Sequence, residues 1–307
     1  MLPITLELPE HFLEREIRSG CPVEAGRKEV WAVELDLLAA LLRFCEENEL
    51  KVYAAFGTLL GAVRHRGFIP WDDDIDLMMP RADYERLCRL ASFDAPLFFQ
   101  TETTDIGFTR AFARLRNSET TAIQNYERDF NIPYNQGIFI DIFPMDYMSD
   151  DREERKRESE AFLKLREKAL RYSLFTFRCN NKTGSVFSSL WIKKCVSTFA
   201  CPLLRALGVN NPYTARIERS LSQKQKSRTL GVYWFYEARK DNAMDEADFA
   251  ETLLQPFEML EIPIPSGYAN ILRREYGDWE TPVMADTSHG ELLMDAKKPY
   301  TAYLKEE

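Results

Sequence analysis

The chain has 307 residues, of which 45% are hydrophobic and 29% are charged, and its formal net charge at pH 7 is −9. This length is enough for one large domain or two modest ones with a sizeable hydrophobic core. An acidic chain without a recognisable nucleic-acid-reading motif is not expected to bind nucleic acid. The N-terminus has neither a basic start nor a long apolar stretch, so we expect no signal peptide and a cytoplasmic location.

The six cysteines include no Cys-x-x-Cys pair, and only three histidines accompany them. We therefore expect reduced, mostly buried thiols. The alternative is a structural zinc site at Cys179, Cys195 and Cys201, although the spacing of these residues fits zinc motifs poorly.

The first 70 residues predict a helix, a strand and a second helix. Residues 24–47 carry apolar side chains at the spacing of an amphipathic helix. Residues 51–56 are predicted to form a short strand that leads into a turn at Gly57 and Thr58. The helix that begins at this turn would present free backbone N–H groups, which commonly bind phosphate.

An acidic segment, Pro-Trp-Asp-Asp-Asp-Ile-Asp at residues 70–76, follows this helix. If residues 74–78 form a strand, the alternation of side chains places Asp74 and Asp76 on one face, about 7 Å apart. Two carboxylates at this spacing can share a divalent cation with the phosphate oxygens of a substrate. An EF-hand is excluded because Leu77 stands where its loop needs a glycine. An exposed acidic turn remains the alternative.

A helix and four strands are predicted next, at residues 80–91, 97–101, 108–116, 120–124 and 138–143. The last strand is almost continuously apolar, as expected of a central strand buried on both faces. Asp141 in its middle is costly unless it binds a metal or pairs with an arginine such as Arg114 or Arg116, and both alternatives stay open. Asp146 is predicted to be a turn or cap residue.

Two segments together resemble a known family. Gly-Thr-Leu-Leu-Gly-Ala-Val-Arg-His at residues 57–65, followed by the acidic segment, is similar to the LicD family of phosphocholine transferases. That family is related to the fukutin proteins and belongs to the nucleotidyltransferase superfamily. Residues 137–146 and 257–282 are also similar to it. The resemblance implies an α/β (α+β) fold, with a nucleotidyltransferase-like mixed β-sheet core flanked by helices and a helical insertion or subdomain.

The resemblance also implies an activity. A LicD-like phosphotransferase would move a phosphate-linked group from a CDP-linked donor to a cell-surface glycan or lipid-linked glycan and release CMP. Phosphocholine is the leading candidate for this group. Asp74, Asp76 and Asp141 would be the catalytic residues and would hold Mg²⁺ or Mn²⁺, with Asp141 alternatively acting as the base. The remaining candidate residues would bind substrate: Gly57, Thr58, Arg64, Arg66, Trp71, Asp73, Arg114, Arg116 and His289.

Other functions remain open at this point. A nucleotidyltransferase that attaches NMP to a small or sugar substrate would use the same three carboxylates. A non-catalytic protein that binds nucleotides or anionic glycans is the third reading. If the cargo is choline, its quaternary ammonium needs an aromatic or acidic cage, for which Trp71 and Trp279 are candidates.

We expect three parts: a catalytic core at residues 1–148, a helical basic region at 149–230, and a C-terminal segment at 231–307 that packs back on the core. Residues 163–228 contain fourteen Lys or Arg and two Glu, a balance of +12, so the rest of the chain carries −21. The apolar stretch at 186–204 is too interrupted to span a bilayer. It either contacts the inner face of an anionic membrane or an anionic acceptor, or forms ordinary helices with solvated lysines.

Overall fold

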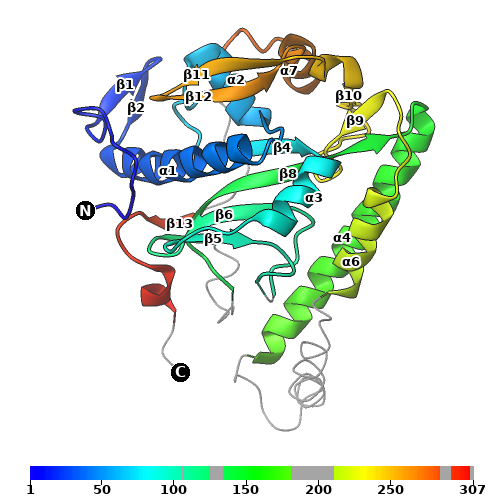
Figure 1. The fold of residues 1–307 in the computed structure, drawn as a ribbon, viewed down its shortest axis with the longest axis horizontal. Helices are drawn as coiled ribbons and strands as arrows, with labels where there is room; N and C mark the ends of the chain where they lie inside the picture. The colour runs from blue at the N-terminus through cyan, green and yellow to red at the C-terminus, as the bar shows by residue number, and fades with distance from the viewer. Residues whose placement is uncertain (106, 125–133, 181–210, 284–291, 305–307) are drawn as a thin grey trace.

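The fold was analysed in a computed structural model that describes residues 1–105, 107–124, 134–180, 211–283 and 292–304. It is mixed α/β, with helices packed around a central mixed sheet (Figure 1). The fold class expected from the sequence is confirmed.

Seven strands form the main sheet of the described residues. Five of them pair in the order β10 (Met244–Asp245), β9 (Thr229–Gly231), β8 (Ile138–Met148), β4 (Asp76–Pro80) and β3 (Tyr53–Ala54). The other two branch from β8: β6 (Ala113–Asn117) pairs with β8, and β5 (Leu97–Gln100) pairs with β6. The β4–β8 pair is parallel, and the other pairs are antiparallel. All but one of the eleven residues of β8 are buried. The predicted central strand is therefore confirmed and is longer than expected.

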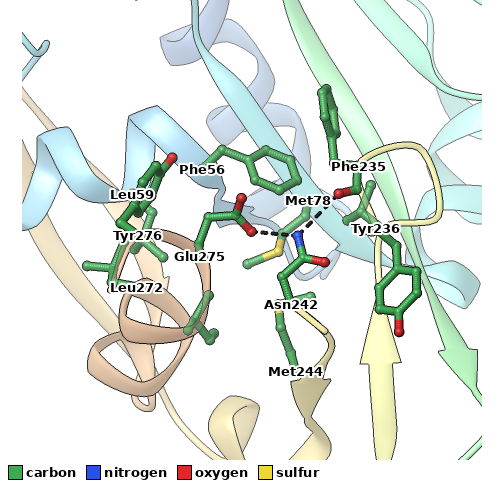
Figure 2. Close-up of a pocket in the computed structure, with 12 residues that line it drawn as sticks. Phe56, Leu59, Met78, Phe235, Tyr236, Asn242, Met244, Leu272, Glu275 and Tyr276 are labelled. Atoms are coloured by element: carbon green, nitrogen blue, oxygen red, sulfur yellow. Dashed lines mark hydrogen bonds between the residues drawn. The ribbon is translucent and has the colours of Figure 1, made fainter. Parts of the chain in front are cut away.

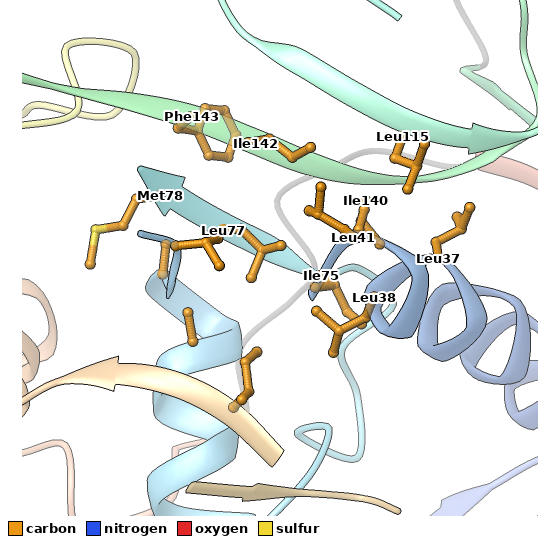
Figure 3. Packing of buried hydrophobic residues seen from close by; sticks show 14 of the residues in the cluster. Leu37, Leu38, Leu41, Ile75, Leu77, Met78, Leu115, Ile140, Ile142 and Phe143 are labelled. Carbon is orange, nitrogen blue, oxygen red and sulfur yellow. The ribbon is translucent and has the colours of Figure 1, made fainter. Parts of the chain in front are cut away.

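Helix α1 (Ala25–Glu47) packs across β6 and β8. Figure 3 shows its leucines facing apolar side chains of the sheet, within one large cluster of buried residues. Truncating one such leucine to alanine typically costs about 2–5 kcal/mol. Helices α2 (Phe56–His65) and α3 (Arg81–Leu90) also contact β4, so helices cover the strand that follows the acidic segment.

Helix α4 (Arg152–Asn180) and helix α6 (Pro212–Ser222) pack together beside the sheet (Figure 1). Asn211 caps α6 by accepting the backbone N–H groups of Tyr213 and Thr214, and its side-chain amide donates to the carbonyl of Ala169 in α4. The charged helix predicted at 150–173 is confirmed. Residues 181–210, which contain the whole apolar stretch at 186–204, lie outside the described residues. No helix in the described ranges is long and apolar enough to cross a bilayer.

The C-terminal part returns to the core in two places. The hairpin of β11 (Thr252–Phe257) and β12 (Leu260–Pro265) lies near β3 and α2, and α7 (Tyr268–Tyr276) ends at Gly277, whose φ is 71°. Strand β13 (Leu292–Asp295) pairs with β7 (Thr121–Gln124). The remaining short elements are β1 (Glu16–Arg18), β2 (Cys21–Val23), η2 (Glu246–Phe249) and η3 (Tyr300–Tyr303). The three-part division itself stays a prediction.

Asp146 was predicted to be a turn or cap residue, and this prediction is wrong. It lies within β8, is 1% exposed, and accepts two hydrogen bonds from Arg81, at 2.7 Å from Nε and 2.8 Å from Nη2. The ion pair allows an acidic side chain to be buried, so the strand continues past Pro144. Two strand boundaries also differ: the strand predicted at 74–78 begins at Asp76, and the strand predicted at 108–116 begins at Ala113.

The cysteines with described side chains, Cys21, Cys45 and Cys88, are free thiols. Burial raises the pKa of the Cys45 thiol to about 12, so it stays protonated at neutral pH. The three cysteines of the alternative zinc site lie outside the residues whose side chains are described.

Candidate active site

Two buried aspartates face each other across the parallel strands β4 and β8. The register pairs Asp76 with Asp141, and the two residues are 7% and 8% exposed. Asp76 begins its strand because its backbone N–H donates to the hydroxyl of Thr58, at 2.8 Å. Thr58 therefore positions one of the predicted metal ligands. Asp76 Oδ1 has no hydrogen-bond partner among the described residues, which leaves a buried carboxylate oxygen available to a ligand.

The loop before β4 carries three more carboxylates. Asp72, Asp73 and Asp74 each offer an oxygen within 4.8 Å of the others, and the three residues are partly exposed. This cluster could hold a metal ion, because carboxylate oxygens are the preferred ligands of Mg²⁺ and Mn²⁺. Asp74 thus belongs to a loop and not to the predicted strand, yet it remains close to Asp76.

The electrostatics of the site favour a cation. Burial raises the pKa of Asp76 well above its ordinary value, and the negative charges of Asp74, Asp141 and Asp72 raise it further, against an opposing effect of Arg114. A positive ion among these oxygens would stabilise the charged form of each carboxyl. The donor set therefore fits the divalent cation that the sequence implied.

Asp141 is paired with an arginine on the neighbouring strand. Arg114 Nε lies 2.5 Å from Asp141 Oδ1, and Arg114 Nη2 lies 3.1 Å from Oδ2. The register of β6 and β8 places the two residues directly opposite each other. This is the arginine pairing considered from the sequence. Each carboxylate oxygen keeps a second lone pair, so the ion pair does not prevent Asp141 from binding a further group.

A cavity of about 520 Å³ opens beside these acids. One wall is built by residues of α2 and the acidic segment, including Gly57, Arg64 and Trp71. The other wall comes from the C-terminal part of the chain and is both aromatic and acidic: Phe235, Glu237, Glu275, Tyr276, Asp278 and Trp279. The site therefore joins segments about 200 residues apart in the chain.

Comparison with known proteins assigns the central part of this site. Residues 49–170 match the family profile described as LicD/FKTN/FKRP, nucleotidyltransferase domain. These residues form a LicD-family nucleotidyltransferase domain. The resemblance seen in the sequence is confirmed, and the matched range contains Asp74, Asp76 and Asp141.

The relatives that match this chain differ in how much of it they cover. It is 24% identical over 262 residues to the lipopolysaccharide cholinephosphotransferase LicD of Haemophilus influenzae, which spans 82% of this chain and 90% of the relative. An uncharacterised protein of Rickettsia prowazekii is 38% identical over 71 residues, 23% of each chain. An uncharacterised protein of Rickettsia typhi is 51% identical over 37 residues, 12% of each chain.

Two glycines shape the LicD-family motif. A Cβ atom on Gly57 would lie 2.6 Å from Asp72 Oδ2, and one on Gly61 would lie 2.5 Å from the carbonyl oxygen of Gly67. Gly57 therefore permits the acidic loop to approach the first turn of α2, as expected of a glycine at a close contact. The close neighbour of Gly57 in this structure is thus a carboxylate of the protein, and the contact of Gly57 with a donor phosphate stays a prediction.

Arg64 is the predicted basic residue that lines the cavity. Its Nη1 donates to the carbonyl of Trp279 at 3.0 Å, and its Nε donates to His65 Nε2 at 2.9 Å. Burial lowers the pKa of His65, and the charges of Arg64 and Arg18 lower it further, so the ring is neutral at pH 7 and can accept this hydrogen bond. Arg64 thus links α2 to the C-terminal wall.

Two other predicted basic residues, Arg66 and Arg116, do not line the cavity, whereas the predicted Gly57 and Trp71 do. Arg66 is exposed at the left-handed end of α2, with φ of 56°. Arg116 is buried and donates to Gln100 Oε1 at 2.6 Å and to the carbonyl of Gly137 at 2.5 Å. His289 lies outside the described residues.

Of the C-terminal wall, the sequence marked Trp279 as a candidate, but it did not mark Phe235, Glu237, Glu275, Tyr276 or Asp278. An apolar cavity of about 20 Å³ adjoins this wall. Figure 2 shows Asn242 between Glu275 and the backbone of Phe235, with a hydrogen bond to each. The amide of Asn242 donates to Glu275 Oε2 at 2.6 Å and to the carbonyl of Phe235 at 3.2 Å. These contacts hold two wall residues in place. No local motif marked them, because their proximity to the aspartates depends on the tertiary fold.

Proposed function

We propose that this protein transfers a phosphate-linked group from a CDP-linked donor to a hydroxyl of a cell-surface glycan or glycolipid precursor. Phosphocholine is the leading candidate for the transferred group. The observation that carries the proposal is the pairing of Asp76 with Asp141 on adjacent strands, next to a cavity that Asp76 lines together with Asp72 and Asp74. The similarity to a lipopolysaccharide cholinephosphotransferase supports the choice of cargo.

In the proposed reaction, an acceptor hydroxyl oxygen attacks the phosphorus that carries the choline. The bond from this phosphorus to the oxygen of CMP breaks, CMP leaves with the electron pair, and the hydroxyl proton passes to a base. Asp141 could take this proton or serve as a metal ligand, since both roles use its remaining lone pairs. Positioning of the donor by fixed groups would supply much of the acceleration.

Asp74, Asp76 and Asp141 would hold Mg²⁺ or Mn²⁺. The fit rests on the unpartnered oxygen of Asp76 and on the nearby carboxylates. When bound, the cation would neutralise charge on the diphosphate and on the departing CMP. Arg64, on the α2 wall of the cavity, is suited to bind a phosphate oxygen, because a guanidinium has five N–H donors. Its Nε and Nη1 each make one hydrogen bond within the protein, so further N–H groups can donate to a phosphate.

The C-terminal wall suits a cationic cargo. Trp71, Tyr276 and Trp279 supply aromatic rings, and Glu275 and Asp278 supply carboxylates, all lining one cavity. A quaternary ammonium is stabilised by the faces of aromatic rings and by nearby negative charge. We therefore rank phosphocholine above a phosphorylated polyol, which carries no positive charge.

We propose further that residues 149–230 face the acceptor or an anionic membrane surface, whereas residues 1–148 and 231–307 supply the reaction site. The residues that line the cavity come from these two parts: from Phe56 to Asp76 in residues 1–148, and from Phe235 to Val283 in residues 231–307. The balance of +12 over residues 163–228 supports contact with an anionic partner.

Product analysis by ³¹P NMR tests the function. The protein would be incubated with Mg²⁺ and, in separate samples, CDP-choline, CDP-ethanolamine, CDP-ribitol or CTP. CMP released from CDP-choline, with the phosphocholine group on water or a glycan acceptor, is the expected result. Pyrophosphate released from CTP would instead favour a nucleotidyltransferase. Lack of turnover with every nucleotide, for protein shown to be folded, would contradict the enzymatic proposal.

A further inference from the structure

Helix α1 contacts the acidic loop through two side chains that bind the same backbone atom. Arg27 Nη1 and Trp31 Nε1 both donate to the carbonyl oxygen of Asp72, at 2.8 and 3.1 Å. The two residues are four positions apart, so they lie one turn apart on the same face of the helix. A carbonyl oxygen has two lone pairs and can accept both hydrogen bonds. The contact comes from outside the matched family range, which begins at residue 49.

Trp31 contacts the same loop at a second point. Its ring stacks on the ring of Phe68, with the two centroids 4.5 Å apart and an angle of 2° between the planes. Trp31 is fully buried, and a buried indole N–H needs an acceptor, which the Asp72 carbonyl supplies. Trp31 therefore holds the chain at Phe68 through its ring and at Asp72 through its N–H group.

The acids that follow lie between two anchored points of the loop. The carbonyl of Ile75 accepts the backbone N–H of Asp141 at 2.9 Å. Asp73 and Asp74 thus belong to a segment that α1 holds at Asp72 and β8 holds at Ile75. The three carboxylates of this loop can bring oxygens within 4.8 Å of one another, and like charges at this distance repel. A loop that keeps them together needs support from rigid elements.

We propose that Arg27 and Trp31 are positioning residues, which hold the Asp72 carbonyl and thereby fix the acidic loop in the arrangement that binds the divalent cation. The inference rests on the proposed function for the presence of that cation. Neither side chain lines the cavity, so neither is expected to touch the donor. Helix α1 packs on β6 and β8, and the loop is therefore tied to the same sheet that carries Asp141.

The competing account is that Arg27 only places a positive charge near the acids. A positive side chain close to three carboxylates opposes the binding of a metal ion, so its removal would strengthen that binding. Loss of a positioning contact has the opposite effect, because the ligands no longer keep the geometry that the ion requires. Arg27→Met removes the charge and the N–H donors but keeps a long side chain. The two accounts therefore predict opposite signs for its effect on metal affinity.

Titration of the full chain with Mn²⁺, without donor or acceptor, tests the proposal. Free Mn²⁺ would be measured by electron paramagnetic resonance. We expect Arg27→Met to bind Mn²⁺ about tenfold more weakly than the unmodified protein. Arg27 is partly exposed, so this variant should stay folded, and urea unfolding checks that it does. Arg43→Met is the matched control, since it makes the same change at an exposed position of the same helix and should leave the affinity unchanged. Equal or tighter binding by Arg27→Met would overturn the proposal.

Trp31→Phe supplies a second variant that does not change any charge. It keeps an aromatic ring to stack on Phe68 and removes the N–H donor to Asp72. We expect weaker Mn²⁺ binding again, and CMP formation that regains its maximal rate at about tenfold higher Mg²⁺. Unchanged Mn²⁺ affinity in both folded variants would overturn the positioning role and leave the proposed function standing. Weaker Mn²⁺ binding in both variants, with no CMP formed by the unmodified protein, would contradict the function and leave the positioning role standing.

Discussion

The ion pair between Arg114 and Asp141 makes Asp141 both a site residue and a structural one. Arg114 is 4% exposed and has both Nε and Nη2 bound to the Asp141 carboxylate. Asp141→Asn keeps one acceptor oxygen but removes the charge, so a buried guanidinium loses its counter-ion. We predict loss of CMP formation together with a fall of about 2–4 kcal/mol in the free energy of unfolding.

Urea unfolding of Asp141→Asn checks this prediction, and activity must be compared at a temperature where both proteins are folded. Unchanged stability would show that the ion pair contributes little, whereas full activity would remove Asp141 from the reaction.

Thr58 offers a second test at the scale of one residue. Its hydroxyl accepts the buried backbone N–H of Asp76. Thr58→Val removes this acceptor at nearly constant volume, and we predict a loss of about 1–3 kcal/mol in the free energy of unfolding and weaker Mn²⁺ binding. Thr58→Ser keeps the hydroxyl and serves as the matched control. If valine and serine behave alike in urea unfolding and Mn²⁺ titration, the hydrogen bond does not position Asp76.

Sequence reasoning singled out Asp74, Asp76 and Asp141 but not Glu34, a carboxylic acid of α1 that is 1% exposed. Asp141 was noticed because an acid inside an apolar strand is costly. The same argument applies to Glu34, which stands among apolar residues in a stretch of α1 that is buried from Val30 to Leu38. The sequence did contain this signal.

At the scale of elements, α2 is held close to the loop that follows it. A methyl group on Gly61 would meet the backbone oxygen of Gly67 at 2.5 Å. We predict that Gly61→Ala lowers the free energy of unfolding by about 1–3 kcal/mol, because the backbone must shift. Gly26→Ala in α1 is the control, since nothing lies within 4 Å of its Cβ position. It should be neutral or stabilising by up to about 1 kcal/mol.

Thermal or urea unfolding of the two glycine variants separates the explanations. A Gly61→Ala protein as stable as Gly26→Ala would mean that the α2 contact is not close in solution.

The contact between the start of α6 and the sheet predicts a pH dependence. Glu102 accepts the backbone N–H of Asn211 at 3.1 Å, and burial raises its pKa from 4.5 to about 7 despite that hydrogen bond. Because the folded pKa is the higher one, the stability from this group is complete below about pH 4.5 and is lost as the pH rises through about 7.

We predict that the free energy of unfolding of the unmodified protein falls between about pH 5 and 8 more than that of Glu102→Gln, which does not titrate. Urea unfolding at several pH values measures both curves. Parallel curves would show that Glu102 has an ordinary pKa in the folded protein.

Element types were more predictable than their ends. The helix at 24–47 was predicted correctly because its apolar side chains repeat at helical spacing over many turns. The strand at 138–143 was predicted correctly because its residues are almost continuously apolar. The end of β8 was missed because Pro144 and Asp146 suggest a turn, and only the Arg81 ion pair shows why the strand continues. Asp74 was placed in a strand because acidic and apolar side chains alternate from residue 74 to residue 77. The pairing with β8 begins only at Asp76.

At the scale of the whole molecule, the cavity depends on the return of the C-terminal part to the N-terminal core. Arg64 in α2 donates to the carbonyl of Trp279, and the wall residues between 235 and 283 complete the space beside the aspartates. A family match limited to residues 49–170 contains the acids but not this wall. The chemistry of the site was therefore readable from one motif, whereas its substrate-facing side required the fold.

We propose above that the aspartate cluster binds a CDP-linked donor through a divalent cation. Calorimetric titration of CDP-choline with Mg²⁺, with EDTA, and into Asp74→Asn tests it most directly. Asp74 lies in a partly exposed loop, so its amide variant should stay within about 0.5 kcal/mol of the unmodified stability. We expect CDP-choline binding to require Mg²⁺ and to be at least about tenfold weaker in Asp74→Asn. Equal affinity in EDTA or in the variant would contradict it.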